Sequence, residues 1–351
     1  MKLVTFVRPG SDPAGLPGIA LPGAGVIDLG RASEAFRGLS MLDVVRRHEE
    51  LLPEARVLAG GEYSLPTGSL LREDEVRLLA PLPRPPSMRD GYAFRQHVET
   101  ARRNRGLPMI PEFDAFPVFY FTNALAVIGP GELRVGGRRL EKLDFELECF
   151  VVIGRPLSNP TLEEADDAIL GYGVMNDLSA RALQMEEMKL NLGPAKGKDF
   201  ATAIGPWLVT KDELAGRLRP SPKGNVLDAR MTAHVNGVPV SDGDVAQMDW
   251  TFAEIVRRAA DGVTLEPGEV IGSGTVGTGC FLELNGSGIT KDQWLKVGDK
   301  VVLEIDRLGR LENTIATVQS PTVGDAPWSP AVDFNAGAAG IYVPSEHDVS
   351  D

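Results

Sequence analysis

The stretch 143–154 limits the possible folds of this chain more than any other part of the sequence. It reads Leu-Asp-Phe-Glu-Leu-Glu-Cys-Phe-Val-Val-Ile-Gly, an alternation followed by a β-branched and aromatic run, which is typical of a β-strand. Successive strand side chains point to opposite faces, so Glu146 and Glu148 should point the same way, and Leu147 and Cys149 the other way. The run 150–153 is apolar on both faces, which predicts a strand buried on both sides.

Two neighbouring carboxylates at the edge of a buried strand need an explanation. They repel each other, and they resist removal from water unless a cation lies between them. One interpretation of Glu146 and Glu148 is a solvated strand face. The other is a divalent ion held by oxygen ligands, and this requires further carboxylates elsewhere in the chain.

Length and charge restrict the class of protein. The chain has 351 residues, 43% hydrophobic and 24% charged, which allows a small leading domain and a larger one. Its 39 glycines and 26 prolines suggest a turn-rich, β-heavy fold. The net charge of −13 argues against nucleic-acid binding. An anionic substrate is still possible, because local arginines, lysines or a metal can reverse the sign within a pocket.

Cysteine usage and hydropathy indicate the compartment. Cys149 and Cys280 both lie in apolar, strand-like runs, which predicts reduced core thiols in a cytosolic protein. The apolar run at the N-terminus is too short for a signal peptide, and no run reaches the length that spans a membrane. We therefore expect a soluble, cytoplasmic protein without a membrane or nucleic-acid partner.

A proline-dense segment at 80–86 divides the chain, because its extended backbone cannot join a helix or a central strand. We predict a small N-terminal domain at 1–84, a catalytic domain at 85–320 and a C-terminal arm or tail at 321–351. The small domain should contain a β-meander, a helix over 41–52 that Pro53 stops, and a strand over 75–79. In the second domain we expect helices over 88–103, 161–170 and 251–258, and strands over 117–128, 143–153, 171–175, 204–209, 228–235, 270–273, 301–305 and 309–316.

Individual polar residues are weak signals. Asp177 could simply cap a helix, and Arg181 and Gln184, one turn apart, could lie on a surface. His97 on an amphipathic helix is more often structural than catalytic. Glu283 is less ordinary, because it lies in the apolar run 280–284, which reads as a buried strand, and buried glutamate is rare unless paired.

The order of these segments along the chain is more informative than any one of them. Over residues 85–317 the series resembles the fumarylacetoacetate hydrolase (fumarylacetoacetase) superfamily. The Glu-x-Glu strand and the Asn-Asp-x-Ser-Ala-Arg and Lys-x-Phe…Gly-Pro-Trp segments are shared widely. The Asp-x-Tyr…Arg-Gln-His and Phe-Leu-Glu-Leu segments resemble the carbon–carbon hydrolase itself. The matching segments are 89–97, 117–120, 144–148, 175–184, 197–207, 272–277 and 281–284.

The resemblance implies a β-rich α+β fold, in which a mixed β-roll catalytic domain follows a small N-terminal α/β domain, and usually a homodimer. It implies catalytic roles for a water-activating pair, His97 and Glu283, and for Lys198 as a donor to developing oxyanions. The implied metal carboxylates form an all-oxygen site suited to Mg²⁺ or Ca²⁺, with Mn²⁺ possible: Asp90, Glu146, Glu148 and Asp177. The implied substrate contacts are Tyr92, Tyr120, Arg181, Gln184 and Thr275.

The function that follows from the resemblance is metal-dependent hydrolysis of a carbon–carbon bond in a small β-diketo acid. Fumarylacetoacetate or a related acylpyruvate from aromatic breakdown, such as tyrosine degradation, is the expected substrate. The alternative is a lyase of the same superfamily, either a β-keto acid decarboxylase or a 2-oxo-enoate hydratase or isomerase. A non-enzymatic β-rich module with a structural ion is the third interpretation, and it leaves His97, Lys198 and Glu283 without a role.

Overall fold

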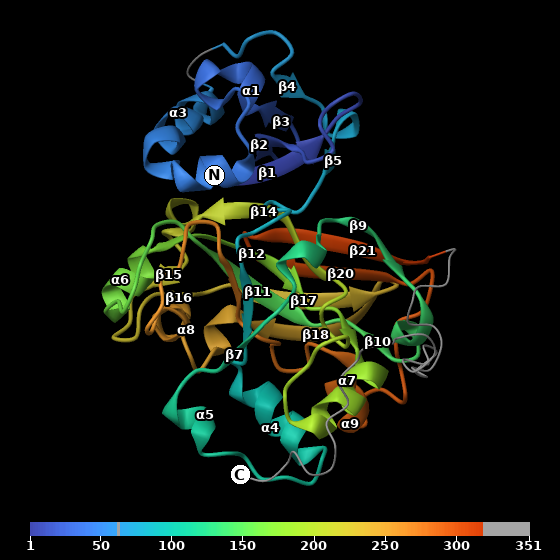
Figure 1. The fold of residues 1–351 in the computed structure, drawn as a ribbon. Coiled ribbons are helices and arrows are strands. Elements are labelled where there is room, and N and C mark those ends of the chain that lie inside the picture. Colours follow the sequence, from blue (N-terminus) through green and yellow to red (C-terminus); the bar gives the residue numbers. More distant parts are fainter. Residues whose placement is uncertain (62–63, 319–351) are drawn as a thin grey trace, which may run out of the picture.

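A computed structural model describes residues 1–61 and 64–318 of the chain (Figure 1). The predicted arm or tail at 321–351 lies outside the described residues. Strands dominate the described part, and they form a large twelve-stranded sheet and a second sheet of five strands. This confirms the predicted β-rich α+β class with a small N-terminal α/β region. Within the described residues, none of the helices has both the length and the apolar character needed to cross a membrane.

The N-terminal region forms a small lobe at one end of the molecule (Figure 1). Its elements are β1 (Lys2–Val7), β2 (Leu16–Leu21), β3 (Gly25–Asp28), α1 (Leu29–Ala32), α2 (Met41–Arg46), α3 (His48–Gly60), β4 (Leu70–Leu71) and β5 (Arg77–Leu78). The prediction that Pro53 ends a helix is wrong, because α3 continues through Pro53 to Gly60. This helix buries Leu51, Leu52 and Ala55. The burial of these side chains offsets the loss of the backbone hydrogen bond that proline cannot donate.

The large sheet joins this lobe to the rest of the chain. Its order is β4-β3-β2-β1-β14-β12-β11-β19-β6-β7, with β5 beside β1 and β8 beside β14. Lys2 of β1 lies opposite Val209 of β14 in an antiparallel pair. One sheet therefore spans the predicted boundary at residue 84. The division into domains stays a prediction. The remaining strands of this sheet are β6 (Met88–Gly91), β7 (Phe119–Phe121), β8 (Val127–Ile128), β11 (Leu147–Ile153), β12 (Ile169–Asn176), β14 (Thr202–Thr210) and β19 (Val270–Gly272).

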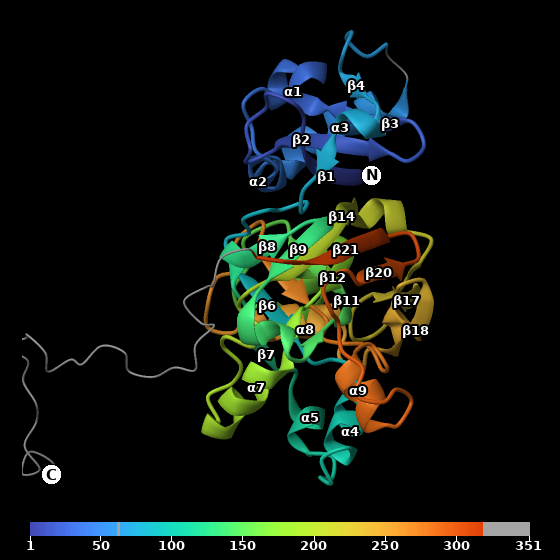
Figure 2. The same ribbon diagram turned by 90° about the vertical axis from the view of Figure 1, so that its right-hand side faces the viewer.

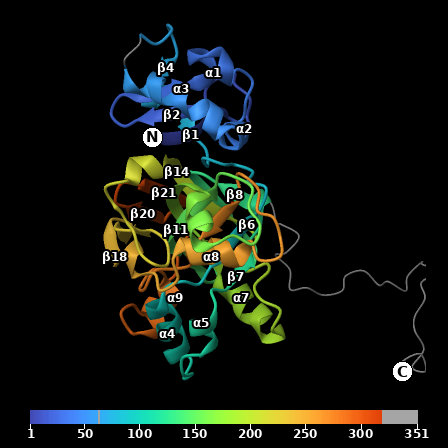
Figure 3. The ribbon, with the colours of Figure 1, turned by 90° about the vertical axis from the view of Figure 1, so that its left-hand side faces the viewer.

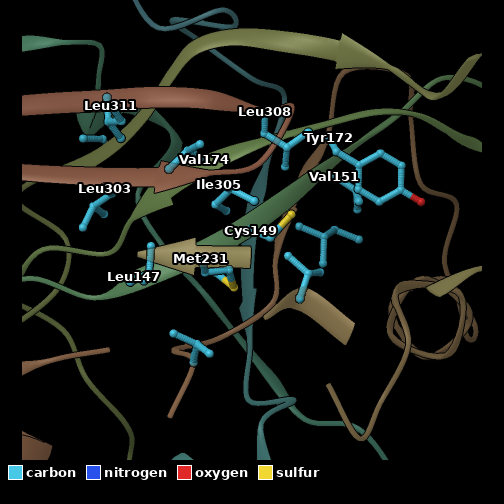
Figure 4. Packing of buried hydrophobic residues seen from close by; sticks show 14 of the residues in the cluster. Leu147, Cys149, Val151, Tyr172, Val174, Met231, Leu303, Ile305, Leu308 and Leu311 are labelled. Carbon is cyan, nitrogen blue, oxygen red and sulfur yellow. The ribbon is translucent and has the colours of Figure 1, made fainter. Parts of the chain in front are cut away.

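Strand β11 is buried on both faces, as its sequence predicts. Leu147, Cys149 and Val151 belong to the main hydrophobic cluster, which Figure 4 shows between the two sheets. Phe150 and Val152 belong to a second cluster, which they share with residues of the N-terminal lobe. The central strand therefore contributes to two hydrophobic clusters at once, and its position is fixed from both sides.

The second sheet covers the main cluster and has the order β18-β17-β20-β21-β9. The dipeptide Asn236-Gly237 takes positive φ at both positions and joins β17 to β18, which confirms the predicted hairpin. The strands of the second sheet are β9 (Gly131–Val135), β17 (Arg230–Val235), β18 (Val238–Asp244), β20 (Lys300–Ile305) and β21 (Gly309–Thr317). Two short strand pairs lie outside both sheets: β10 (Leu143–Asp144) with β13 (Ser179–Ala180), and β15 (Leu218–Arg219) with β16 (Val226–Leu227).

Several helices gather at the end opposite the N-terminal lobe, as Figures 2 and 3 show for α4, α7 and α9. Two predictions are wrong here. The segment 88–103 is not one helix, because Met88 of β6 pairs in parallel with Val270 of β19 and α4 begins only at Arg95. The run 280–284 is not a strand but the start of α9. The helices of the larger region are α4 (Arg95–Arg103), α5 (Glu112–Ala115), α6 (Leu162–Asp167), α7 (Arg181–Glu187), α8 (Phe252–Ala259) and α9 (Phe281–Gly286).

Candidate active site

Three carboxylates from neighbouring strands meet inside the large sheet. Asp90 lies in β6, Glu148 in β11, and Asp177 directly after the end of β12. Because β12, β11, β19 and β6 are consecutive in the sheet, these side chains converge, and one oxygen of each lies within 4.8 Å of the others. All three residues are buried, with exposed fractions of 3%, 0% and 0%.

The hydrogen bonds of this three-carboxylate group are incomplete. Asp90 Oδ1 accepts from the backbone N–H of Gly274 at 3.1 Å, and Glu148 Oε1 accepts from Thr275 Oγ1 at 3.3 Å. Asp177 Oδ2 accepts from the hydroxyl of Tyr120 at 2.5 Å. Among the described residues, Glu148 Oε2 and Asp177 Oδ1 are buried without a hydrogen-bond partner. Unpaired buried oxygens of this kind are positioned to bind a cation.

Burial raises the pKa of all three carboxyl groups. Removal from water and the nearby Asp177 raise the pKa of Asp90 to about 8. Burial, together with Asp90 and Asp177, holds the pKa of Glu148 well above its usual range. Burial also raises the pKa of Asp177, although Lys198 opposes this. The group therefore binds protons readily when no other cation compensates its charge.

Glu146 lies beside this group but is paired differently. Its Oε1 accepts from Nη2 of Arg181 at 2.7 Å, and its Oε2 accepts from Nζ of Lys198. Lys198 also donates to Oδ2 of Asp177 at 2.5 Å, so one ammonium group bridges the two carboxylates. Burial alone would raise the pKa of Glu146, but Arg181 and Lys198 lower it far below its usual value. A fourth metal ligand at Glu146 stays a prediction.

A histidine and a glutamate form a second buried group. His97 of α4 places Nδ1 2.6 Å from Oε2 of Glu283 in α9, and the two residues are 6% and 3% exposed. The ring of Tyr92 meets the imidazole edge-on, with 5.7 Å between the ring centroids. In the neutral tautomer that donates from Nδ1 to Glu283, the lone pair lies on Nε2.

The remaining predicted site residues lie around these two groups. Tyr120 and Thr275 donate to members of the three-carboxylate group. Gln184 is half-buried, and its Oε1 accepts from Nη1 of Arg181 at 2.9 Å. Their roles as substrate contacts stay predictions.

Asp144 is a further buried acid of this region, and it is not among the predicted site residues. It is fully buried and accepts a hydrogen bond from Nε of Arg181 at 2.9 Å. Its carboxylate also accepts from the backbone N–H groups of Phe281 and Leu282, at 2.8 and 3.0 Å. The alternation Asp144, Glu146, Glu148 was a signal for it, because an acid two residues before Glu146 in a buried strand also needs partners.

A family model for the C-terminal domain of fumarylacetoacetate (FAA) hydrolase matches residues 87–316, the part that holds both groups. The chain belongs to this family. Within the FAA hydrolase family, the chain is 27% identical over 309 residues to oxaloacetate tautomerase YisK from Bacillus subtilis (strain 168), covering 85% of this chain and 95% of that protein.

Solved structures show the same fold. The chain superposes with a TM-score of 0.65 and 25% identity on fumarylacetoacetate hydrolase from the psychrophile Exiguobacterium antarcticum, covering 91% of this chain and all of that one. Maleylpyruvate hydrolase from Sphingobium sp. SYK-6, solved in complex with manganese(II) and pyruvate, gives the same TM-score and coverage at 19% identity. The FAA hydrolase fold of this chain therefore includes its N-terminal lobe.

Proposed function

We propose that this member of the FAA hydrolase family is a divalent-metal-dependent hydrolase. It would cleave a carbon–carbon bond in a β-diketo acid such as fumarylacetoacetate or an acylpyruvate. The observation that carries the proposal is the 2.6 Å contact between Nδ1 of His97 and Oε2 of Glu283. Hydrolysis needs a base that activates water, and a buried histidine oriented by a carboxylate is such a base.

The residues of the three-carboxylate group fit a divalent cation. They provide only oxygen donors, and buried oxygens of Glu148 and Asp177 lack partners among the described residues. Such donors suit Mg²⁺, Ca²⁺ or Mn²⁺. Asp90, Glu148 and Asp177 would hold the ion, with Glu146 as the predicted fourth ligand. When bound, the ion supplies a Lewis acid for substrate oxygens.

His97 would first take a proton from water and later return it to the substrate. Its Nε2 accepts a proton from water, and the water oxygen adds to a carbonyl carbon of the substrate. Glu283 stabilises the imidazolium that results, as an ionised neighbour at hydrogen-bond distance. The bond between this carbon and the α-carbon then breaks, and its electron pair leaves with the α-carbon. That carbon takes the proton back from His97, which gives a carboxylic acid and a shorter keto acid or ketone.

Two buried cations next to these groups suit an acidic substrate. Arg181 and Lys198 are 3% and 5% exposed and lie against Glu146. They offer N–H donors to a substrate carboxylate and to oxygens that gain charge during the reaction. Both cations are already paired with buried carboxylates, so an anionic substrate would also need the bound divalent cation to offset the negative charge of the site. We also expect the enzyme to act as a homodimer.

A second candidate is a tautomerase for a β-keto acid. The likeness to an oxaloacetate tautomerase over 85% of this chain favours it. A tautomerase moves a proton between carbon and oxygen and breaks no carbon–carbon bond, so His97 would serve as the proton carrier without activating water.

One experiment separates the two candidates. Purified protein is given fumarylacetoacetate, a short acylpyruvate and enol-oxaloacetate, each with Mg²⁺, with Mn²⁺ and with chelator. Metal-dependent loss of diketone absorbance, accompanied by one equivalent of released acid and lost in His97→Ala, is the expected result. If only the enol form of oxaloacetate is converted, without loss of carbon, the hydrolase proposal is wrong and the tautomerase candidate takes its place.

A further inference from the structure

We propose that Asp144 is a positioning residue that holds the His97–Glu283 pair and Arg181 in one arrangement. The inference rests on the proposed roles of His97 and Glu283 and adds a residue to that machinery. Asp144 touches neither His97 nor the three-carboxylate group through any of its hydrogen bonds. It would act through the elements that carry Glu283 and Arg181.

The first connection is to the beginning of α9. The N-cap residue of this helix, Cys280, makes no side-chain capping hydrogen bond. The carboxylate of Asp144 provides the cap instead, because it accepts from the N–H groups of Phe281 and Leu282, the first two residues of the helix. Free N–H groups and the positive end of the helix dipole favour an anion at this point. The next residue of α9 is Glu283, so Asp144 fixes the turn from which Glu283 reaches His97.

The second connection is to Arg181. Oδ2 of Asp144 accepts from Nε of this arginine, whose Nη2 donates to Glu146. Asp144 and Glu146 thus hold the guanidinium at two of its three nitrogens, which restricts its orientation. In addition, β10 pairs with β13, and Asp144 lies opposite Ser179, two residues before Arg181. The arginine is held both through its backbone and through its side chain.

The carboxylate of Asp144 has no hydrogen-bonding capacity to spare for a substrate. Its Oδ1 accepts from the N–H of Phe281 and from its neighbour Phe145, at 2.8 and 3.0 Å, and its Oδ2 accepts from Leu282 and Arg181. With four donors and full burial, the side chain is rigid and inaccessible. Its contribution is therefore to geometry, and a small displacement of a catalytic pair can reduce turnover by up to about 100-fold.

The test compares Asp144→Asn with a capping variant remote from the site, Thr161→Ala. Thr161 caps α6, where its Oγ1 accepts from the N–H of Glu164 at 3.2 Å. Both variants weaken the start of a short helix. In Asp144→Asn one oxygen becomes an amide NH₂ that faces N–H donors, so either Leu282 and Arg181 or Phe281 and Phe145 lose an acceptor. We expect a fall in kcat on the order of 10- to 100-fold for Asp144→Asn, a rise in KM because Arg181 is held less firmly, and little change in Mg²⁺ affinity. Thr161→Ala should retain wild-type kcat.

Hydrogen–deuterium exchange supplies a measurement that does not need turnover. The amides of residues 281–283 should exchange faster in Asp144→Asn and at the wild-type rate in Thr161→Ala. If the wild-type protein hydrolyses no diketone, the proposed function fails while this measurement still tests Asp144. The inference is overturned if the amides of 281–283 keep their protection in Asp144→Asn. It is also overturned if the wild type is active and both variants lose the same fraction of kcat.

Discussion

Nδ1 of His97 lies 2.6 Å from Oε2 of Glu283, although 186 positions of sequence separate the two residues. Replacing His97 by alanine should lower kcat by roughly 10²- to 10⁴-fold, because the general base is lost. The Mg²⁺ affinity of this variant, measured by calorimetry, should remain within about threefold of the wild-type value, since His97 does not belong to the proposed metal site. His48→Gln is the matched control, because His48 lies in α3 and contacts the backbone of Val45. A variant without His97 that keeps wild-type turnover would disprove its role as base.

The raised carboxyl pKa values predict an unusual dependence of stability on pH. Asp90, with a pKa near 8, and Glu148 keep their protons in the folded state at pH values where the unfolded chain has lost them. Their contribution to stability is complete below the ordinary carboxyl pKa of about 4 and is lost as the pH rises through the folded-state value. The melting temperature of chelator-treated protein should therefore fall as the pH rises from about 4 to about 8. Saturating Mg²⁺ should flatten this dependence, and calorimetry should show protons released on binding. If the melting temperature depends on pH equally with and without Mg²⁺, a metal site at these residues is contradicted.

Removing the ammonium group that bridges Glu146 and Asp177 should destabilise the metal-free protein. Lys198→Met leaves two buried carboxylates without their shared cation, which costs on the order of 3–5 kcal/mol in the free energy of unfolding. Urea unfolding in chelator measures this loss, and Mg²⁺ should recover part of it. Lys196→Met, two positions earlier, is the control, because Lys196 is exposed and its ion pair is with Asp199 on the surface. The prediction is refuted if the two variants unfold at the same urea concentration.

A glycine in β19 leaves the space that Asp90 occupies. A Cβ atom at Gly272 would come within 2.3 Å of Oδ1 of Asp90 and of Cε of Met175. Gly272→Ala should therefore displace Asp90 and weaken Mg²⁺ binding by about tenfold, or ~1.4 kcal/mol. Gly216→Ala is the control, because no atom of the described residues lies within 4 Å of a Cβ at that position. Unchanged Mg²⁺ affinity in Gly272→Ala would show that Asp90 does not bind the ion.

Local pattern predicted the central part of this structure well. The alternation and the apolar run of 143–153 indicated a strand buried on both sides, and β11 lies between two hydrophobic clusters. The hairpin at Asn236-Gly237 followed from turn chemistry, which is local. The order of motifs then indicated the family, to which the match over 87–316 assigns the chain.

The errors arose where distant residues decide the local structure. Residues 88–91 become a strand because β19 pairs with them, and no pattern within the segment reveals that partner. Residues 281–286 become a helix that is capped by Asp144, more than a hundred positions earlier in the chain. Helix α3 continues past Pro53 because it packs on a sheet. In each case, tertiary contacts override the local preference.

Strand β19 also determines when the active site can first exist. It contributes only Val270–Gly272, yet it is the strand that joins β11 to β6 and so brings Asp90 beside Glu148. During synthesis, therefore, more than three-quarters of the chain must leave the ribosome before these carboxylates can meet. A dissolved metal ion thus has no complete site to guide early folding, and it can only secure an architecture that is nearly finished.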